Sequence, residues 1–319
     1  MSEAKPLLVS GIKPTGDLHI GNYFGAMRQF VELTKTGKYK AFIFVADYHA
    51  LNTMQDADEM RRRTREIVMA YLAVGLDPKE VVFYKQSDVP AHTELCWIFD
   101  TITTMPYLQR AHAYKDAEAK NKEIGVGTFN YPLLMAADIL LYDAAVVPVG
   151  QDQKQHIEIA RDTAEKFNRV YKTEVFKLPE PHILADVAVV PGTDGQKMSK
   201  SYGNVIPLFA SRDELAKAVM SIVTNSSEGK PENLYNIHKL VRAESELVGP
   251  YAVGNNFKEL KEMLVEDLDQ YLVPIRAKYE ELQKNPGVVD EILAAGKLEA
   301  RAVSEAKMEQ IRRAIGVAL

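Results

Sequence analysis

Short apolar runs alternate with amphipathic stretches over the first two-thirds of the chain. The runs are rich in β-branched and aromatic residues, and they comprise Leu7–Val9, Phe42–Val45, Val81–Tyr84, Val146–Val149 and Val187–Val190. Runs of this length with helices between them are typical of strands buried in a parallel sheet. The pattern therefore predicts an α/β fold with a Rossmann-like, doubly wound parallel sheet, which binds ligands at the carboxyl ends of its strands.

Capping residues mark the ends of several predicted helices. Asp56–Glu59 and Ser211–Glu214 have the pattern of a capping box, in which a short polar residue precedes an acidic residue by three positions. Gly75 and Pro78 end the first of these helices, because glycine accepts left-handed backbone angles and proline cannot continue a helix. These signals place a helix between the second and third apolar runs.

The strand signal ends at about residue 205, and long helical stretches follow. We expect helices from about 256 to 283 and from 288 to 315, with Pro274 kinking or splitting the first of them. The chain is therefore predicted to have two domains. An α/β domain is expected over residues 1–205 and an all-helical domain over residues 206–319.

The composition is that of a globular protein. The 319 residues are 46% apolar and 26% charged with a net charge of −5, so a polyanion must be held by a local basic patch. The single cysteine, Cys96, cannot form an intrachain disulfide or supply a metal site alone. Residues 1–6 lack a signal-peptide pattern, and Asp138 and Asp143 interrupt the longest apolar stretches. We expect a cytoplasmic protein without a membrane segment.

A turn punctuated by glycines follows the first apolar run. Ser10–Asn22 carries Gly11, Gly16 and Gly21 before a helical pattern begins. Glycines permit close approach of the backbone, and a helix starting after Gly21 offers free N–H groups to a phosphate. The turn is neither a Walker loop nor a GxGxxG loop. Its spacing alone fits an ordinary strand-to-helix loop equally well.

Two lysines lie on a second glycine-rich loop, after the last apolar run. Lys197 and Lys200 have hydroxyl side chains beside them, and Pro191–Gln196 precedes them. Positive charge placed where charge develops is the main catalytic device of phosphoryl-type transfer. The loop therefore has the residues of a mobile clamp for a triphosphate, although lysine runs are usually solvated basic loops.

These two elements resemble the signature motifs of one enzyme class. Pro14–Asn22, called the first motif below, is similar to the His-Ile-Gly-His motif of class I aminoacyl-tRNA synthetases, with asparagine in the last position. Lys197–Ser201, called the second motif, matches their Lys-Met-Ser-Lys-Ser motif in full and follows in the family's order. The resemblance implies that ATP and Mg²⁺ are ligands of this chain.

The resemblance also implies roles for individual residues. His19 and Asn22 would hydrogen-bond the ATP phosphates, and Lys197 and Lys200 would stabilise the transferring α-phosphate and the departing pyrophosphate. These four residues are the expected catalytic residues. The residues expected to bind ATP are Lys13, Pro14, Thr15, Gly21, Asn22, Gly150, Gln151, Asp152, Lys197, Met198, Ser199, Lys200 and Ser201.

Some positions depart from the family pattern. Relatives often have an aromatic residue in place of Val9, glutamine in place of Lys13 and glutamate in place of Gln151. One wall of the pocket and one phosphate contact are therefore expected to differ. A lysine-rich loop at residues 115–122 is expected to supply a further phosphate contact.

One carboxylate, Asp138, interrupts the apolar stretch Asn130–Tyr142. A charge among apolar neighbours must be paired or must bind a ligand. The ordinary interpretation is that Asp138 lies on a helix face and pairs with a lysine or a backbone N–H group. Asp47, Tyr48 and His49 follow the second apolar run, and positioning a loop or contacting a substrate is equally expected of them.

The segment Val147–His156 closely resembles tryptophanyl-tRNA synthetases, and the resemblance extends over nearly the whole chain. It implies that Asp138 accepts a hydrogen bond from the indole N–H group of tryptophan while Met135 packs on the ring. Phenylalanine would leave the carboxylate unpaired, whereas tyrosine can still donate its hydroxyl, so pocket shape must reject tyrosine. The residues expected to bind tryptophan are His49, Tyr131, Met135, Asp138, Val147, Val149 and Gln153.

The resemblance implies the activity of a tryptophan–tRNA ligase. Such an enzyme converts L-tryptophan and Mg-ATP to tryptophanyl-adenylate and pyrophosphate, and then transfers tryptophan to the 3′-terminal ribose of tRNA(Trp). The α/β domain is expected to bind both small substrates and to form a homodimer, and the helical domain to read the anticodon. The alternatives are a tyrosyl-tRNA synthetase, a small-metabolite adenylyltransferase, and a synthetase-like binding or regulatory protein without charging activity.

Overall fold

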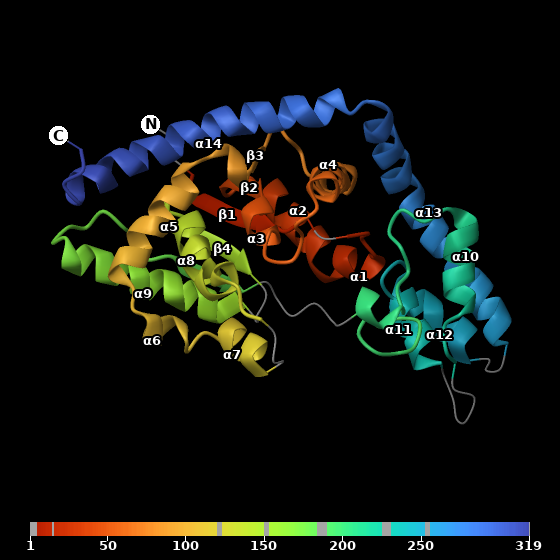
Figure 1. Ribbon diagram of the computed structural model, residues 1–319. Helices are drawn as coiled ribbons and strands as arrows, with labels where there is room; N and C mark the ends of the chain where they lie inside the picture. The colour runs from red at the N-terminus through yellow and green to blue at the C-terminus, as the bar shows by residue number, and fades with distance from the viewer. Residues whose placement is uncertain are drawn as a thin grey trace.

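A parallel β-sheet forms the centre of the molecule (Figure 1). The computed structural model describes residues 5–14, 16–119, 123–149, 153–183, 190–224, 231–252 and 256–318. Within these residues the sheet has five strands in the order β3-β2-β1-β4-β5, and all neighbouring strands are parallel. The strands are β1 (Leu7–Ile12), β2 (Lys40–Val45), β3 (Val81–Lys85), β4 (Val146–Val149) and β5 (Glu180–Ile183).

Helices cover the sheet and make up most of the second half of the chain. In Figure 1, α5, α8 and α9 lie together beside the sheet, and α10–α13 form a separate group at the other end of the molecule. The α-helices are α1 (Ile20–Asn22), α2 (Arg28–Lys35), α3 (Asp47–Ala50), α4 (Ala57–Ala73), α5 (Ala91–Ile102), α6 (Met105–Leu108), α7 (His112–Ala119), α8 (Val126–Leu140), α9 (Lys154–Val170), α10 (Arg212–Met220), α11 (Glu232–His238), α12 (Glu244–Ala252), α13 (Phe257–Lys284) and α14 (Gly287–Ala314). Shorter helical turns are η1 (Tyr23–Met27), η2 (Gln86–Asp88) and η4 (Lys200–Tyr202).

Successive side chains of the central strands enter two different hydrophobic cores. Leu8 and Ile43 pack in the core that contains α2 and α4, whereas Val9 and Phe42 pack in the core that contains α5, α8 and α9. Each of these four side chains is buried. Because both faces are covered, the strands appear in the sequence as continuous apolar runs. The predicted Rossmann-like α/β fold is confirmed.

The last helix, α14, covers the edge of the sheet at β3 (Figure 1). Gly296 permits this close approach, because a Cβ atom there would lie 1.9 Å from the carbonyl oxygen of Phe83. On either side of Gly296, Leu293 joins the core that contains α4, and Met308 joins the core that contains α5. The C-terminal helix thus packs against the sheet, and the predicted division at residue 205 stays a prediction.

Asp56 and Ser211 cap their helices as predicted, and of the two only Ser211 forms a reciprocal capping box. The Asp56 side chain accepts a hydrogen bond from the backbone N–H of Glu59 at 2.8 Å, at the start of α4. Ser211 and Glu214 form a reciprocal capping box at the start of α10. Gly75, just after α4, has a φ of +104°, which explains why the helix ends there.

Two details differ from the sequence-based expectations. Helix α13 continues through Pro274, so the helix is not split there, and Leu272 and Ile275 on either side are buried in the core; a kink at Pro274 stays a prediction. The edge strand β5 lies at Glu180–Ile183. A proline and two polar residues there break the apolar pattern by which a strand is predicted from sequence. Residues 187–189 of the predicted run Val187–Val190 lie outside the described residues.

Candidate active site

A pocket lies where the order of the strands reverses. β1 pairs with β2 on one side and with β4 on the other, so the sheet is built outward in both directions from this point. α/β sheets bind ligands in the crevice at such a switch point. The pocket has a volume of about 610 Å³ and is lined by Val9, Ser10, Gly11, Lys13, Phe44, Ala46, His49, Asn52, Thr53, Thr128, Tyr131, Met135, Asp138, Ile139, Val147, Pro148 and Gln153.

This pocket collects the residues expected to bind tryptophan. They come from α3, α8, β4 and the start of α9, and those that line the pocket are His49, Tyr131, Met135, Asp138, Val147 and Gln153. The side chain of Val149 lies outside the described residues. Lys13, from the predicted ATP site, lines the same pocket. The geometry therefore places the predicted amino-acid site next to the first motif.

Asp138 is a buried carboxylate of this pocket, with 2% of its surface exposed. Gln86 Nε2 donates to its Oδ1 at 2.7 Å, and His92 Nδ1 lies 2.6 Å from the same oxygen. His49 Nε2 lies 2.8 Å from Oδ2. The partners are thus an amide and two imidazoles, not the lysine or backbone N–H group of the ordinary interpretation.

These hydrogen bonds keep Asp138 ionised. Burial alone would raise the pKa of Asp138, but the hydrogen bonds from His49 and His92 outweigh burial and hold the pKa at about 2. An ionised carboxylate only accepts hydrogen bonds. The pocket therefore contains an acceptor for a ligand that carries an N–H or O–H donor among apolar atoms.

Polar contacts also position the walls of the pocket. The Tyr131 hydroxyl lies 2.9 Å from Nε2 of the buried His156, which gives His156 a supporting role. The Asp47 side chain accepts a hydrogen bond from the backbone N–H of Ser87 at 3.0 Å, and it thereby joins the loop after β2 to the loop after β3. Asp47 therefore positions loops, whereas His49 contacts the pocket.

The first motif begins a helix with a reciprocal cap. Nδ1 of His19 accepts from the backbone N–H of Asn22 at 3.3 Å, and the Asn22 side-chain oxygen accepts from the backbone N–H of His19 at 3.0 Å. Burial, reinforced by the charge of Lys200, lowers the pKa of His19 to about 4, so the ring is neutral. Because Nδ1 is an acceptor, the proton lies on Nε2. The cap leaves His19 Nε2–H and the Asn22 amide N–H group as donors.

Helix α1 begins at Ile20, earlier than the expected start after Gly21. The Ile20 N–H donates to the carbonyl of Ile206 at 2.9 Å, and the cap takes a second backbone N–H. These backbone donors are therefore used within the protein, and the expectation that they are free for phosphate is wrong. At Gly21 a Cβ atom would lie 2.8 Å from His19 Nδ1 and 3.2 Å from Met198 Cβ, so glycine is required for packing.

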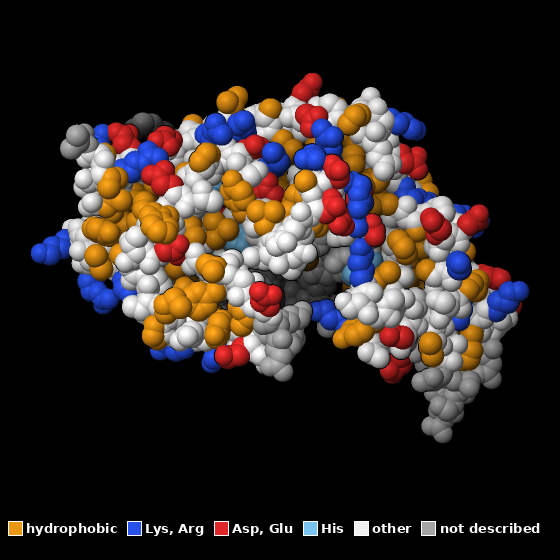
Figure 2. Space-filling view, in the orientation of Figure 1, with side chains coloured by type: hydrophobic (Ala, Val, Ile, Leu, Met, Phe, Trp, Pro, Cys, Tyr) orange, Lys and Arg blue, Asp and Glu red, His pale blue; other side chains and the backbone are white. Residues whose placement is uncertain are grey.

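Backbone contacts join the first motif to residues 206–208, which follow the second motif. The Leu208 N–H donates to the carbonyl of Leu18 at 2.9 Å, and His19 forms an antiparallel bridge with Pro207. Met198 is buried beside the first motif. Between the sheet and helices α10–α12 the surface is hollowed, with Lys and Arg side chains at the rim (Figure 2). Two motifs far apart in the sequence thus belong to one site.

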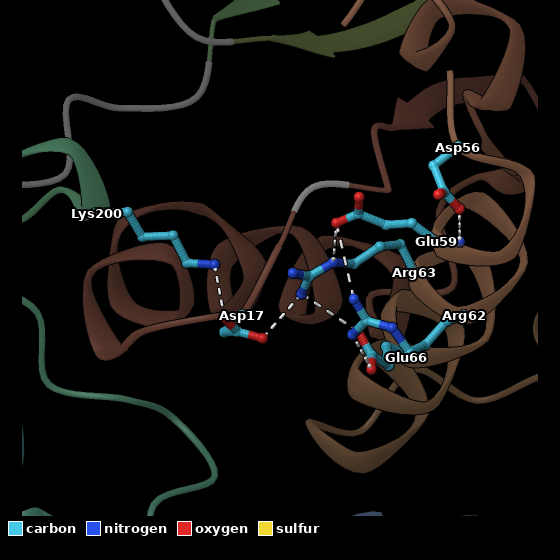
Figure 3. Close-up of polar contacts among 7 residues, drawn as sticks. All are labelled: Asp17, Asp56, Glu59, Arg62, Arg63, Glu66 and Lys200. Carbon is cyan, nitrogen blue, oxygen red and sulfur yellow. Dashed lines mark hydrogen bonds and ion pairs between the residues drawn. The ribbon is translucent and has the colours of Figure 1, made fainter. Parts of the chain in front are cut away.

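An ion pair joins the two motifs directly (Figure 3). Lys200 Nζ lies 3.1 Å from Asp17 Oδ2, and Arg63 Nη1 donates to Asp17 Oδ1 at 2.8 Å. Arg63 is held in turn by Glu59 and Glu66 at 3.4 Å each. Hydrogen bonds from Arg63 and Lys200 lower the pKa of Asp17 to about 2. The Asp17 and Lys200 side chains are 76% and 42% exposed, so water and anions reach this contact.

Asn204 holds the backbone of the second motif. Its side-chain oxygen accepts from the backbone N–H of Ser199 at 2.8 Å, and its amide group donates to the Lys197 carbonyl at 3.2 Å and to Asp194 at 2.7 Å. Asn204 is 2% exposed, whereas Lys197 and Ser201 are exposed. The backbone is thus anchored while the lysine side chain extends into solvent.

Comparison with known proteins identifies the family. Residues 1–281 match the family described as tRNA synthetases class I (W and Y), where the letters denote tryptophan and tyrosine. The chain is 47% identical over 318 residues to the tryptophan–tRNA ligase of Fusobacterium nucleatum, with 97% of both chains covered. It is 44% identical over 320 residues to that of Campylobacter jejuni, with 97% of this chain and 99% of the relative covered. This chain belongs to the bacterial tryptophan–tRNA ligases of class I.

A solved structure extends the likeness to the fold. The crystal structure of tryptophanyl-tRNA synthetase from Campylobacter jejuni complexed with ADP and tryptophan has a TM-score of 0.91 and 43% identity to this synthetase. The alignment covers 97% of this chain and 99% of that one. The tyrosyl-tRNA synthetase from Archaeoglobus fulgidus, at 21% identity and a TM-score of 0.64, shares the fold.

Part of the predicted ATP site of the synthetase lies outside the described residues. These positions are Thr15, Gly150, Gln151 and Asp152, together with Lys120 and Lys122 of the lysine-rich loop. Lys115 lies on α7, and Pro14, the first residue of the first motif, is buried. The structure thus describes the two signature motifs and the amino-acid pocket more fully than the nucleotide contacts after β4.

Sequence reasoning does not single out Gln86, His92, Asp17 or Asn204. A buried carboxylate needs donors, but no contrast with apolar neighbours marks Gln86 or His92, because Gln86 lies between Lys85 and Ser87, and Thr93 and Glu94 follow His92. Asp17 and Asn204 lie in polar loops, where no such contrast marks them. The contact of Asp17 with Lys200 depends on the approach of the two motifs, and the contact of Asn204 with Ser199 depends on how the loop of the second motif folds.

Proposed function

We propose that this synthetase activates L-tryptophan with ATP and transfers it to tRNA(Trp). The observation that carries the proposal is the pocket beside the two nucleotide motifs, in which Asp138 is buried and ionised. The three described protein partners of Asp138 leave one acceptor position open to the pocket, and a ligand with one N–H in an apolar ring system suits that position. The relatives named as tryptophan–tRNA ligases support the same substrate.

The indole ring occupies the apolar part of the pocket in this proposal. Oδ2 of Asp138 accepts the indole N–H, and Met135 and Val147 pack against the ring. Gln153 lies at the start of α9 and faces the α-amino group, and Tyr131 contributes another wall. A ligand without a donor leaves the last acceptor position of Asp138 unfilled beside apolar atoms, and this penalty discriminates against phenylalanine.

Adenylate formation proceeds by positioning and charge. The tryptophan carboxylate attacks the α-phosphate of ATP in line, a carboxylate–phosphorus bond forms, and the bond to pyrophosphate breaks. His19 Nε2–H and the Asn22 amide donate hydrogen bonds to phosphate oxygens, while Lys197 and Lys200 neutralise the charge that develops. No side chain is needed as a covalent nucleophile. Burial raises the pKa of Cys96 to about 12, which makes its thiol a poor nucleophile.

Mg²⁺ enters as part of the substrate Mg-ATP in this proposal. The described residues contain no cluster of three or more His, Cys, Asp or Glu side chains able to hold a metal ion. Mg²⁺ commonly keeps several waters and is bound largely through substrate phosphates. The residues of the two motifs therefore contact the phosphates and not the ion.

The transfer of tryptophan to tRNA, the homodimer and the cytoplasmic location are proposed from the likeness to the family. The 2′-hydroxyl of the terminal tRNA ribose attacks the activated carbonyl, and AMP leaves. The helices after residue 205 read the anticodon, and two copies of the chain form a homodimer in the cytoplasm. Among the described residues, no helix has the length and hydrophobicity needed to cross a bilayer.

Amino-acid-dependent pyrophosphate exchange tests the proposal. The purified protein is given ATP, labelled pyrophosphate and each of the twenty amino acids in turn, and tryptophan is expected to drive exchange. Exchange driven by tyrosine instead would establish a tyrosyl-tRNA synthetase. Exchange with tryptophan but no charging of tRNA(Trp) would indicate a synthetase-like protein with another role.

A further inference from the structure

A buried histidine–tyrosine pair lies behind Asp138 and does not line the pocket. His92 on α5 and Tyr142, just after α8, are 0% and 1% exposed. His92 Nδ1 lies 2.6 Å from Asp138 Oδ1, and His92 Nε2 lies 3.1 Å from the Tyr142 hydroxyl. The imidazole therefore bridges the carboxylate and the phenol.

The chemistry of these partners determines where the proton of His92 lies. An ionised carboxylate cannot donate, so a short contact to Nδ1 requires a proton on Nδ1. If the ring is neutral, Nε2 is then an acceptor, and the Tyr142 hydroxyl donates to it. If the ring is charged, Nδ1 still carries its proton. In both states His92 donates to Asp138.

Within the described part of the chain, the donors around Asp138 leave one direction for a ligand. The two oxygens of a carboxylate have about four acceptor positions. Gln86 and His92 occupy both positions on Oδ1, and His49 occupies one on Oδ2. The remaining position on Oδ2 is the one available to a ligand in the pocket.

We propose that His92 is a positioning residue for substrate specificity: supported by Tyr142, it holds Asp138 so that Oδ2 meets a ring N–H donor in one fixed direction. This inference rests on the proposed function, in which the donor is the indole N–H of tryptophan. The indole N–H lies in the ring plane and cannot rotate. The phenol O–H of tyrosine rotates about its C–O bond, and it adapts more easily to a carboxylate that has lost its support.

The matched variants are His92→Leu, His92→Asn and Tyr142→Phe. Leucine removes the donor, whereas asparagine places an amide N–H near the position of Nδ1. Tyr142→Phe removes the hydroxyl that supports Nε2. We expect His92→Leu to raise the KM for tryptophan about 10–100-fold, Tyr142→Phe about 3–10-fold, and His92→Asn to recover much of the loss.

The chain offers a matched control. His238 is also fully buried, with Nε2 2.6 Å from Asp267 and Nδ1 3.0 Å from the Tyr251 hydroxyl, but it lies on α11. His238→Leu is expected to lower stability without changing the KM for tryptophan. An equal rise in KM in His238→Leu would mean that general destabilisation explains the His92 result.

Pyrophosphate exchange with tryptophan and with tyrosine provides the specificity readout. In His92→Leu, the ratio of kcat/KM for tryptophan to that for tyrosine is expected to fall at least tenfold, while the KM for ATP stays within about twofold of wild type. Wild-type exchange that depends on tyrosine would refute the proposed function itself. Wild-type exchange with tryptophan and an unchanged ratio in His92→Leu and Tyr142→Phe would refute only the role of His92.

A pH profile separates positioning from simple packing. The groups that face Asp138 are His49 from α3, Gln86 from η2, His92 from α5 and, beyond them, Tyr142. Burial and the charge of Asp138 both raise the pKa values of Cys96 and Tyr84.

Removing His92 takes away one of the hydrogen bonds that oppose the effect of burial, so the pKa of Asp138 rises. The neutral acid then carries a proton and loses its free acceptor position. Tryptophan affinity in His92→Leu is therefore expected to begin to fall at a higher pH than in wild type as the pH is lowered. Profiles that fall at the same pH in the two proteins would contradict the inference.

Discussion

The two ends of the site each contain a carboxylate whose pKa hydrogen bonds lower to about 2, but one carboxylate is buried and the other is exposed. Asp138 in the amino-acid pocket is 2% exposed, and hydrogen bonds from His49 and His92 overcome the effect of burial. Asp17 at the phosphate end has a side chain that is 76% exposed, and hydrogen bonds from Arg63 and Lys200 lower its pKa. Equal pKa values therefore describe a fixed acceptor in one place and an exchangeable ion pair in the other.

The difference matches the chemistry expected at each end. Selection of an amino acid needs a donor–acceptor geometry that stays the same from one turnover to the next. Binding and release of a triphosphate need cations whose partners can be replaced at low cost. A buried, multiply bonded carboxylate meets the first need, and an exposed ion pair, worth roughly 0–1 kcal/mol, meets the second.

Lys200→Ala is expected to have the largest effect, and it acts at the phosphate end. Removing a charge that is needed mainly in the transition state is expected to lower kcat for adenylate formation about 10²–10³-fold. Tryptophan affinity, measured by equilibrium dialysis, should change by less than about threefold. Lys258→Ala is the control, because this lysine also pairs with a carboxylate but lies on α13. Equal losses in rate and in tryptophan binding would contradict the division of the site into two ends.

Asp138→Asn tests the other end. The amide keeps the size of the carboxylate but places an N–H group where Gln86, His92 or His49 already donates. We expect kcat/KM for tryptophan to fall roughly 10–100-fold, mainly through KM, since hydrogen bonds to charged groups contribute about 1.5–3 kcal/mol.

Asp100→Asn is the control for this change. Asp100 is a partly buried aspartate that accepts a hydrogen bond from Asn130 and does not line the pocket. Its substitution should leave tryptophan kinetics within about twofold of wild type. An unchanged specificity constant in Asp138→Asn would remove this carboxylate from substrate recognition.

The sequence predicts the fold to the extent that local pattern determines it. β1 to β4 are apolar runs buried on both faces, and the long helices have caps such as Asn256 and Ser211 that mark where they begin. β5 is not predicted, because its place at the edge of the sheet tolerates a proline. The path of α14 across β3 depends on Gly296, and an isolated glycine in a helix does not tell what it approaches.

The candidate site, too, is predicted from the sequence only as far as local pattern determines it. Motifs and one isolated carboxylate predict which residues face the pocket, and the lining of the pocket agrees for Asp138, Met135 and Val147. The partners of that carboxylate come from three segments, α3, η2 and α5, whose meeting is a property of the tertiary fold. Local sequence pattern therefore indicates a need for donors but not the residues that supply them.

Asp17→Asn is expected to have the smallest effect, and it sharpens the comparison most directly. Lys200 Nζ lies 3.1 Å from Asp17, so the phosphates of ATP compete with this carboxylate for Lys200. Loss of the carboxylate charge should therefore lower the KM for ATP, by no more than about fivefold because exposed ion pairs are worth at most about 1 kcal/mol. The kcat for exchange should stay within about twofold of wild type.

Salt and a second aspartate provide the controls for this last variant. Raising NaCl screens an exposed pair, so the difference in ATP KM between wild type and Asp17→Asn should shrink as ionic strength rises. Asp58→Asn removes a comparable exposed pair with Arg61 on α4 and should not alter the KM for ATP. A higher KM in Asp17→Asn would mean that Asp17 holds Lys200 in its working position. The phosphate end would then be as preorganised as the pocket around Asp138, and the contrast between the two ends would not hold.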